Sequence, residues 1–222
     1  MTVTLASASH RTGLRSGAGR GVLGRSVRLV LAGHRPGERP KGAPLPALAV
    51  LGRSNVGKSS LLNALLGVKV ARVSQTPGRT QALYWYRVDD SFDVVDCPGY
   101  GWAKAAKEKR ATFEEMIEKL LIGSEDAPAA SCALLLADGR LEPQESDRSM
   151  ALFLGNAGVP TVVAATKWDA VKPSERVRRL RSLSSEFADS ERPLLPVSSE
   201  TGENLPGLAR LLRERLRTPS SP

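Results

Sequence analysis

The sequence predicts an α/β fold, a mostly parallel sheet of six or more strands with helices on both faces. From residue 47 onward, apolar runs of strand length alternate with segments of helical periodicity. The length of 222 residues, with 41% hydrophobic residues, suits one such domain with short extensions. A glycine-rich pattern also ends one apolar run and opens a helical segment, as α/β nucleotide folds require.

Six apolar runs are the candidate strands of this sheet. In such sheets ligands bind beyond the carboxyl ends of the strands, so functional residues are expected there. A further candidate strand, Val27–Ala32, precedes them and is followed by a polar, proline-rich connection that ends at Pro46. The six runs are Ala47–Leu51, Ala82–Val88, Phe92–Asp96, Ser131–Asp138, Thr161–Lys167 and Leu194–Ser198.

Three segments between or after these runs have apolar residues at helical spacing. The spacing i, i+3, i+4, i+7 places apolar side chains on one face of a helix, and we assign these faces to the core. The three sets are Phe113, Met116, Ile117, Leu120 and Leu121, then Met150, Phe153, Leu154 and Ala157, then Leu205, Leu208, Leu211 and Leu212.

The first candidate site is a phosphate loop that matches G-x-x-x-x-G-K-[ST]. Its backbone amides and the following helix N-terminus can surround phosphate oxygens. Lys58 would reach the β- and γ-phosphates, and the Ser59 hydroxyl would bind Mg²⁺. A purely structural glycine turn is the alternative, which the strand-to-helix context argues against. The loop comprises Gly52, Arg53, Ser54, Asn55, Val56, Gly57, Lys58 and Ser59.

A second element, Asp96-Cys97-Pro98-Gly99, ends the run Phe92–Asp96. Asp96 would hold Mg²⁺ through water, and Gly99 would offer its amide to the γ-phosphate. The same four residues also suit a plain turn, but their place after a phosphate loop favours the functional interpretation. Between the two elements, Thr80 is the candidate second hydroxyl ligand of Mg²⁺, with Thr76 as a competitor.

Two further elements predict that the base is guanine. In Thr166-Lys167-Trp168-Asp169, the Asp169 carboxylate can accept from both guanine N1–H and N2–H₂, a donor pair that adenine lacks. The aliphatic stem of Lys167 can cover the base. In Val197-Ser198-Ser199, the Ser199 amide is the candidate donor to guanine O6. Each tetrapeptide or tripeptide alone also fits a strand end, but the four elements in order predict a P-loop GTPase fold and a GTP-hydrolysing enzyme.

The formal net charge of +9 lies mostly near the N-terminus. Residues 1–41 hold eight basic residues and one acid, so this segment can contact RNA phosphates or simply remain solvated. Residues 1–24, rich in Ser, Gly and Arg, are predicted to be a disordered basic extension, and residues 218–222 a flexible tail. A mitochondrial or plastid transit peptide and a start codon assigned too early are the alternatives for residues 1–24.

The compartment and partners are constrained by two further observations. The two cysteines, Cys97 and Cys132, lack the spacing of metal ligands and fit a reducing cytoplasm. Apolar runs fall short of the roughly 18 residues that span a bilayer, so we expect no membrane partner.

These residues together resemble the EngB (YihA/YsxC) family of ribosome-biogenesis GTP-binding proteins, of the translation-factor-like class. The resemblance rests on GRSNVGKSSLLNALL, PGRTQ, DCPGYG, TKWD and VSSETG, and on HRPGERP before the first core strand. It covers about residues 25–217, the expected GTP-binding domain. This sequence departs from the family at Cys97, where Leu is common, and at Glu200, where Lys or Leu usually follows the paired serines.

The resemblance implies a monomeric switch that binds GTP and GDP, with Mg²⁺ at Ser59 and Thr80. It also implies a role in assembling the large ribosomal subunit, and we expect links to septation and cell division. From the chemistry of the motifs, Lys58, Thr80 and Gly99 are the predicted catalytic residues. Action on tRNA modification or cell division is the alternative target. Beyond the phosphate loop, the implied nucleotide contacts are Gly78, Arg79, Thr80, Gln81, Ala82, Asp96, Cys97, Pro98, Gly99, Thr166, Lys167, Trp168, Asp169, Val197, Ser198 and Ser199.

The rate of hydrolysis is predicted to be slow for the chain alone. Many GTPases place glutamine directly after D-x-x-G to orient water, and this chain has Tyr100 there. Asn55 is a candidate K⁺ ligand beside the phosphates, with a local backbone bond as the alternative. GTP would order the loops 67–81 and 98–112, and the basic, aromatic second loop could face RNA. An ATP-using P-loop enzyme and a non-catalytic RNA-binding module are the rival classes.

Overall fold

The computed structural model describes residues 16–18, 21–69, 82–100, 107–124, 128–189 and 191–217. The side chains of residues 16–18, 107–110 and 113 are outside this description. The predicted tail 218–222, residues 70–81 of the first predicted loop and residues 101–106 of the second therefore lie outside the described residues. Residues 107–112, predicted to belong to the second loop, are instead helical.

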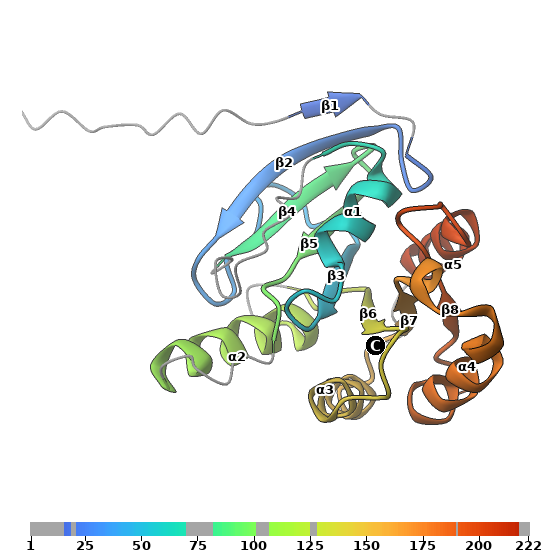
Figure 1. Cartoon of the computed structure of the whole chain (residues 1–222). Helices are drawn as coiled ribbons and strands as arrows, with labels where there is room; N and C mark the ends of the chain where they lie inside the picture. Colours follow the sequence, from blue (N-terminus) through green and yellow to red (C-terminus); the bar gives the residue numbers. More distant parts are fainter. Residues whose placement is uncertain are drawn as a thin grey trace, which may run out of the picture.

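Within these residues eight strands form one sheet in the order β1-β2-β4-β5-β3-β6-β7-β8 (Figure 1). Strand β3 pairs in parallel with β5 and β6, and β6, β7 and β8 continue in parallel. Strands β1, β2 and β4 join the other side as antiparallel neighbours. The bounds are β1 Ser16–Ala18, β2 Ser26–Gly33, β3 Ala47–Gly52, β4 Leu83–Val88, β5 Phe92–Asp96, β6 Cys132–Asp138, β7 Thr161–Thr166 and β8 Leu194–Pro196.

The helices cover both faces of the sheet, as the sequence predicted (Figure 1). Helices α1 and α5 pack with one set of buried side chains, and α2, α3 and α4 pack with the other. The predicted apolar faces supply buried residues to each set. The bounds are α1 Lys58–Leu66, α2 Lys107–Ile122, α3 Glu145–Asn156, α4 Pro173–Phe187 and α5 Leu205–Arg217, with a short 3-10 helix at Trp168–Ala170.

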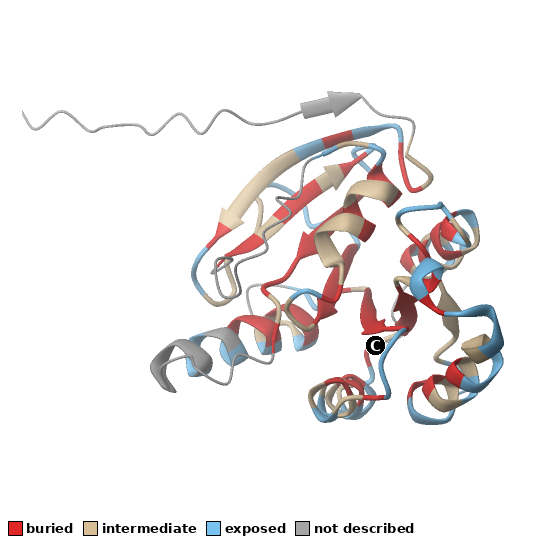
Figure 2. Ribbon diagram, in the orientation of Figure 1, coloured by how far each residue is buried: buried red, intermediate tan, exposed pale blue. Residues whose placement is uncertain are grey.

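The central strands are apolar along their whole length because helices cover them on both sides. Every residue of β3, β6 and β7 is buried (Figure 2). Along β3 the side chains alternate, with Leu48 and Val50 facing α1 and α5, and Ala49 and Leu51 facing the other helices. A parallel sheet buried in this way shows near-continuous hydrophobic runs.

The packed part of the chain begins earlier than the sequence predicted. Leu23 is 1% exposed, and its amide donates to the Leu65 carbonyl oxygen of α1 at 2.9 Å. A Cβ placed at Gly21 would lie 2.3 Å from the Leu66 carbonyl carbon, so the chain there rests directly on helix α1. Residues 21–24 are thus part of the fold, and β1 pairs with β2, which corrects the expected boundary at residue 25. Residues 1–15 and 19–20 lie outside the described residues.

The carboxyl ends of β3, β5, β6 and β7 reach the same edge of the sheet. Their last residues are Gly52, Asp96, Asp138 and Thr166 respectively, and the last three of these carry polar side chains. The neighbouring strands are in register there, with Val50 opposite Asp96 and Asp138 opposite Thr166. The fold therefore brings together the segments in which the sequence predicted function. No helix in the described part of the chain is long and apolar enough to cross a membrane.

Candidate functional site

The phosphate loop runs from the end of β3 into helix α1. Asn55 has φ 64° and Gly57 has φ 105°, so the loop curls through left-handed backbone before the helix begins. Glycine is required at position 57 because other residues rarely adopt this φ. At Gly52 the reason differs: a Cβ there would lie 2.8 Å from Val56 Cγ1 and 3.0 Å from Leu136 Cβ. The two glycines of the pattern thus serve curvature and close packing.

Lys58 lies across this loop at the start of helix α1. Its Nζ donates to the carbonyl oxygens of Gly52 at 3.1 Å and Arg53 at 3.3 Å. Burial lowers the pKa of Lys58, while the charge of Asp96 acts in the opposite direction. The ammonium is therefore held at the loop, where it can face phosphate oxygens.

Asp96 ends strand β5 and is 6% exposed. Burial raises its pKa to about 6, and the nearby Lys58 ammonium opposes that rise. A buried carboxylate of this kind is stabilised by added positive charge. The arrangement fits the Mg²⁺-holding role that the sequence predicted for it.

The segment after Asp96 lies against the phosphate loop. The Ser54 amide donates to the Tyr100 carbonyl oxygen at 3.2 Å, and the Tyr100 amide donates to the Gly52 carbonyl oxygen at 3.3 Å. A Cβ at Gly99 would lie 2.7 Å from the Ser54 amide nitrogen and 2.9 Å from Lys58 Nζ. Gly99 is therefore needed for close approach to the loop. Cys97 is buried, and burial raises the pKa of its thiol, so it is not a reactive thiolate.

Tyr100, the residue directly after D-x-x-G, makes a side-chain contact that sequence reasoning missed. The Tyr100 hydroxyl donates to Asp147 Oδ1 at 2.9 Å, and Arg53 Nε donates to Asp147 Oδ2 at 2.9 Å. Burial raises the pKa of both Tyr100 and Asp147. Tyr100 is 8% exposed and its phenol is directed into the protein. No local sequence pattern could have revealed this contact, because Asp147 lies in helix α3, 47 residues after Tyr100 and 94 after Arg53.

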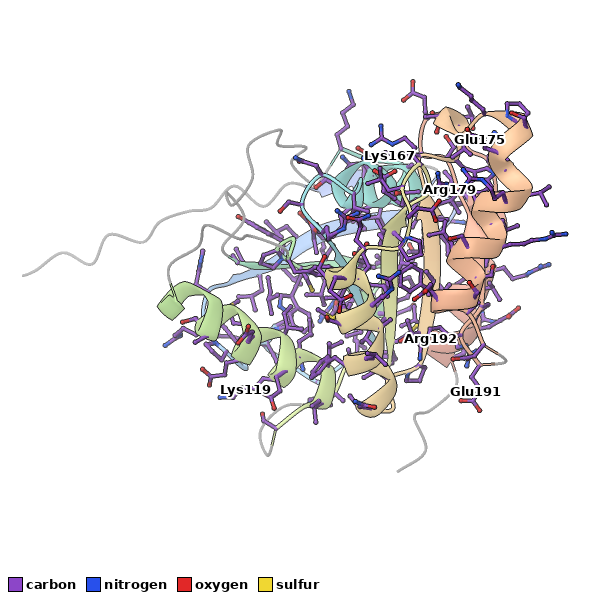
Figure 3. The ribbon with its side chains drawn as sticks, turned by 60° about the horizontal axis from the view of Figure 1, so that its bottom comes forward. Lys119, Lys167, Glu175, Arg179, Glu191 and Arg192 are labelled. Carbon is purple, nitrogen blue, oxygen red and sulfur yellow. The ribbon has the colours of Figure 1, made fainter. Side chains whose placement is uncertain are left out.

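The third predicted element contacts the first. Thr166 Oγ1 lies 2.7 Å from the Val56 carbonyl oxygen, and Lys167 Nζ donates to the Asn55 carbonyl oxygen at 2.6 Å. Lys167 has φ 57°, a left-handed conformation at the end of β7. In Figure 3 it lies near the start of α1, at the end of the molecule opposite Lys119 and Glu191. The segment that is predicted to bind the base and the phosphate loop are thus in direct contact.

Asp138, at the end of β6, holds Lys167 in this position. Lys167 Nζ donates to Asp138 Oδ2 at 2.9 Å, and Arg140 donates to both carboxylate oxygens at 2.8 Å and 2.9 Å. Burial alone would raise the pKa of Asp138, but the hydrogen bonds from Arg140 and Lys167 outweigh it and lower the pKa to about 2. Asp138 was not among the predicted site residues, although an acid that ends a buried strand was an available signal.

The fourth predicted element contacts the third. Ser198 Oγ donates to Asp169 Oδ1 at 2.6 Å, and the Trp168 amide donates to the Val197 carbonyl oxygen at 3.2 Å. The amides of Glu200 and Thr201 donate to the same Ser198 oxygen. Asp169 itself is exposed, so it is oriented by the loop and open to a ligand. Trp168, in contrast, is 3% exposed and belongs to the core.

The described residues fit Mg²⁺ at the phosphate end of this site. Mg²⁺ prefers oxygen ligands and retains waters, so a hydroxyl and one carboxylate suffice beside phosphate oxygens. Ser59 follows Lys58 in helix α1, and Asp96 is close enough to act on Lys58 electrostatically. Ala82 is fully buried. The other implied residues of its segment, Gly78–Gln81, lie outside the described residues with Thr76, so the predicted Thr80 ligand stays a prediction.

Comparison with known proteins agrees with this geometry. The family described as 50S ribosome-binding GTPase matches residues 47–167. The chain is 39% identical to a probable GTP-binding protein EngB of Thermotoga petrophila over 193 residues, which is 86% of this chain and 96% of the relative. It is 41% identical to the protein of the same description from Gemmatimonas aurantiaca over 184 residues, 82% of this chain and 88% of the relative.

Solved structures show the same fold. The crystal structure of a probable GTP-binding protein engB matches with a TM-score of 0.59 at 23% identity, over 77% of this chain and 98% of that one. Era in complex with MgGDPNP and nucleotides 1506–1542 of 16S ribosomal RNA matches with a TM-score of 0.61 at 24% identity, over 82% of this chain and 60% of that one.

Proposed function

Because the chain belongs to the EngB family of P-loop GTPases, we propose that it is a GTP-dependent switch that assists assembly of the large ribosomal subunit. The hydrolysis of GTP follows from the family itself. The role at the large subunit is supported by the family description, 50S ribosome-binding GTPase, and by the basic N-terminal segment. The activity is proposed to belong to a monomer in the bacterial cytoplasm, where the two buried thiols would stay reduced.

One contact supports the nucleotide site more than any other. Lys167 Nζ reaches the Asn55 carbonyl oxygen of the phosphate loop at 2.6 Å, so base and phosphate elements form one site. In this proposal Asp169 accepts from guanine, oriented by Ser198, while Lys58 and the loop amides hold the phosphates. Ser59 and Thr80 would ligate Mg²⁺, with Asp96 acting through water. Bound Mg²⁺ would neutralise phosphate charge.

The chain is proposed to hydrolyse GTP slowly by itself. The Tyr100 hydroxyl is engaged by Asp147, so it is not available to orient the attacking water. We expect a rate well below about 1 s⁻¹ for the protein alone, and a faster rate with 50S subunits; stimulated GTPases reach about 5–20 s⁻¹. Phosphate release measured with and without subunits tests this. A fast rate for the isolated chain would contradict it.

K⁺ is proposed as a second cation at Asn55. This residue is exposed and has left-handed backbone at the turn of the phosphate loop, which leaves its side chain accessible from solvent. Hydrolysis is expected to be faster in K⁺ than in Na⁺ at equal ionic strength, and Asn55→Ala is expected to abolish the difference. Equal rates of the wild-type chain in both salts would exclude the idea.

The partner is tested by sedimentation with purified ribosomal subunits. The chain is expected to sediment with 50S subunits in the presence of a non-hydrolysable GTP analogue and to remain mostly free with GDP, because hydrolysis would release the ordered loops. Purified 30S subunits are the matched control. Equal sedimentation in both nucleotide states, or with 30S subunits alone, would overturn the proposed role.

A further inference from the structure

The Asp147 carboxylate joins three elements around the phosphate site. It lies in the first turn of α3 and is 1% exposed. Its two oxygens are used separately, one by the Tyr100 hydroxyl and the other by Arg53 Nε, each at 2.9 Å. Arg53 belongs to the phosphate loop and Tyr100 to the segment after β5. One buried side chain therefore contacts both segments that surround the phosphates.

Backbone hydrogen bonds connect Tyr100, one of the two partners of Asp147, directly to the phosphate loop. Arg53 and Tyr100 also form an isolated parallel bridge, through the Ser54 amide and the Gly52 carbonyl. Gly99 directly precedes Tyr100, and a Cβ there would meet Lys58 Nζ at 2.9 Å. Any displacement of Tyr100 would therefore move Gly99 relative to the ammonium that is proposed to hold the γ-phosphate.

The buried negative charge of Asp147 is balanced by its neighbours. A buried carboxylate is costly unless it is paired and hydrogen-bonded, and here both requirements are met by residues of the phosphate site. Replacement by asparagine would keep an acceptor for the Tyr100 hydroxyl but remove the charge that holds Arg53. Replacement of Tyr100 by phenylalanine would remove the hydroxyl and leave the Arg53–Asp147 pair intact.

We propose that Asp147 is a positioning residue for GTP hydrolysis: it holds Arg53 and Tyr100 on one carboxylate and thereby sets Gly99 against the phosphate loop. The inference rests on the proposed function of the same site and deepens it. Asp147 does not touch the nucleotide; it acts through Tyr100 and Arg53. It follows that the position of helix α3 is coupled to the geometry of the γ-phosphate site.

The chain offers a matched control for the test. Asp93, near the start of β5, is 3% exposed and pairs with Arg87 through two hydrogen bonds of 2.9 Å and 3.0 Å. The pair has the same chemistry and similar burial as Asp147 with Arg53, but Asp93 lies at the opposite end of β5 from Asp96. Asp93→Asn therefore reports the cost of breaking a buried carboxylate–arginine pair away from the phosphate site.

The experiment compares Asp147→Asn, Tyr100→Phe and Asp93→Asn in the full chain, measuring steady-state hydrolysis, melting temperature and the affinities of fluorescent GDP and a fluorescent GTP analogue. Asp147→Asn and Tyr100→Phe are expected to lower kcat roughly 10- to 100-fold, as misplacement by about 1 Å does elsewhere, with KM changed less than about threefold. Asp93→Asn should lower the melting temperature comparably and leave kcat unchanged.

Two results would overturn the inference without touching the proposed function. One is that all three variants lose stability but hydrolyse GTP as the wild-type chain does. The other is that Asp147→Asn raises kcat, which would mean that the contact restrains the reaction. If the wild-type chain itself neither binds nor hydrolyses GTP, the proposed function fails instead, and the two failures are distinguishable.

Discussion

Gly99 shows at the scale of one residue how closely two segments of the site approach each other. A methyl group at this position would lie 2.7 Å from the Ser54 amide nitrogen, a backbone atom that cannot move aside cheaply. We therefore expect Gly99→Ala to lower GTP hydrolysis at least about tenfold while GDP affinity changes less than about threefold. Stopped-flow binding and phosphate release measure both quantities.

A suitable control for Gly99→Ala is Gly207→Ala in helix α5. A Cβ there meets only Leu195 Cδ2 at 3.8 Å, an ordinary contact, so hydrolysis should be unchanged. If Gly99→Ala also left hydrolysis unchanged, the close approach of its segment to the phosphate loop would have no functional role.

Asp138 makes stability depend on pH in a defined direction. Its folded-state pKa of about 2 lies below the ordinary value of 3.8, so its stabilising contribution is present above about pH 4 and is lost as pH falls toward 2. We expect Asp138→Asn to lower the free energy of unfolding by about 2 kcal/mol at pH 6, and the difference from the wild type to shrink between pH 4 and pH 2. Urea unfolding across this range checks it.

The control for this pH dependence is the surface pair of Arg28 and Asp90. Both side chains are largely exposed, and exposed pairs contribute about 0–1 kcal/mol. Asp90→Asn should therefore change stability little at any pH. A constant difference between Asp138→Asn and the wild type from pH 6 to pH 2 would show that the Asp138 charge does not stabilise the fold.

Candidate site residues could be predicted where several residues that contact the same part of the ligand lie close together in the sequence. Lys58, Lys167 and Asp169 each lie in a short motif whose side chains suit the binding of phosphate or guanine. The structure brings the segments of these motifs together. Asp147 was missed because its partners are distant in sequence: it is 94 residues from Arg53 and 47 from Tyr100. Contacts of that range arise from the fold and leave no local pattern.

At the scale of elements, the strands were predictable because a parallel sheet covered on both faces needs continuous apolar runs. The ends of the strands were less predictable. Strand β8 ends at Pro196 and not at the predicted Ser198, because Val197 and Ser198 form hydrogen bonds with the segment around Asp169. The antiparallel pairing of β2 with β4 was also not foreseen. Pairing between distant strands depends on tertiary packing, which periodicity does not encode.

The N-terminal segment before β2 was misjudged from its composition. Its glycines and arginines suggest disorder, but Leu23 fills a place on helix α1 and Gly21 permits the contact. We expect Leu23→Ala to lower the free energy of unfolding by about 2–5 kcal/mol, the usual cost of truncating a fully buried leucine. Chemical denaturation checks this.

Arg25→Ala is the neighbouring control for Leu23. The Arg25 side chain is exposed, so its truncation should change stability by less than about 0.5 kcal/mol. If Leu23→Ala were equally neutral, the segment 21–24 would not be an integral part of the fold.

At the scale of the whole molecule, the uneven charge predicts how binding to the proposed ribosomal partner depends on salt. Residues 1–24 carry Arg11, Arg15 and Arg20 and no acid. If this segment contacts rRNA phosphates, log K should fall with log salt, and replacing Arg11, Arg15 and Arg20 by Gln should reduce the slope by about 2. Sedimentation with 50S subunits at several salt concentrations measures it. An unchanged slope would mean that the segment is only solvated.

The proposed GTP specificity of the chain depends on the binding of guanine by Asp169 beside the phosphate loop. Competition of GDP and ADP against fluorescent GDP tests this most directly, on the wild-type chain, on Asp169→Asn and on the control Asp189→Asn. We expect GDP to bind at least about 100-fold more tightly than ADP. Asp169→Asn should weaken GDP binding roughly 10- to 100-fold, while xanthosine diphosphate gains affinity from the new amide donor. Equal displacement by ADP and GDP, or an unaltered GDP affinity in Asp169→Asn, would contradict it.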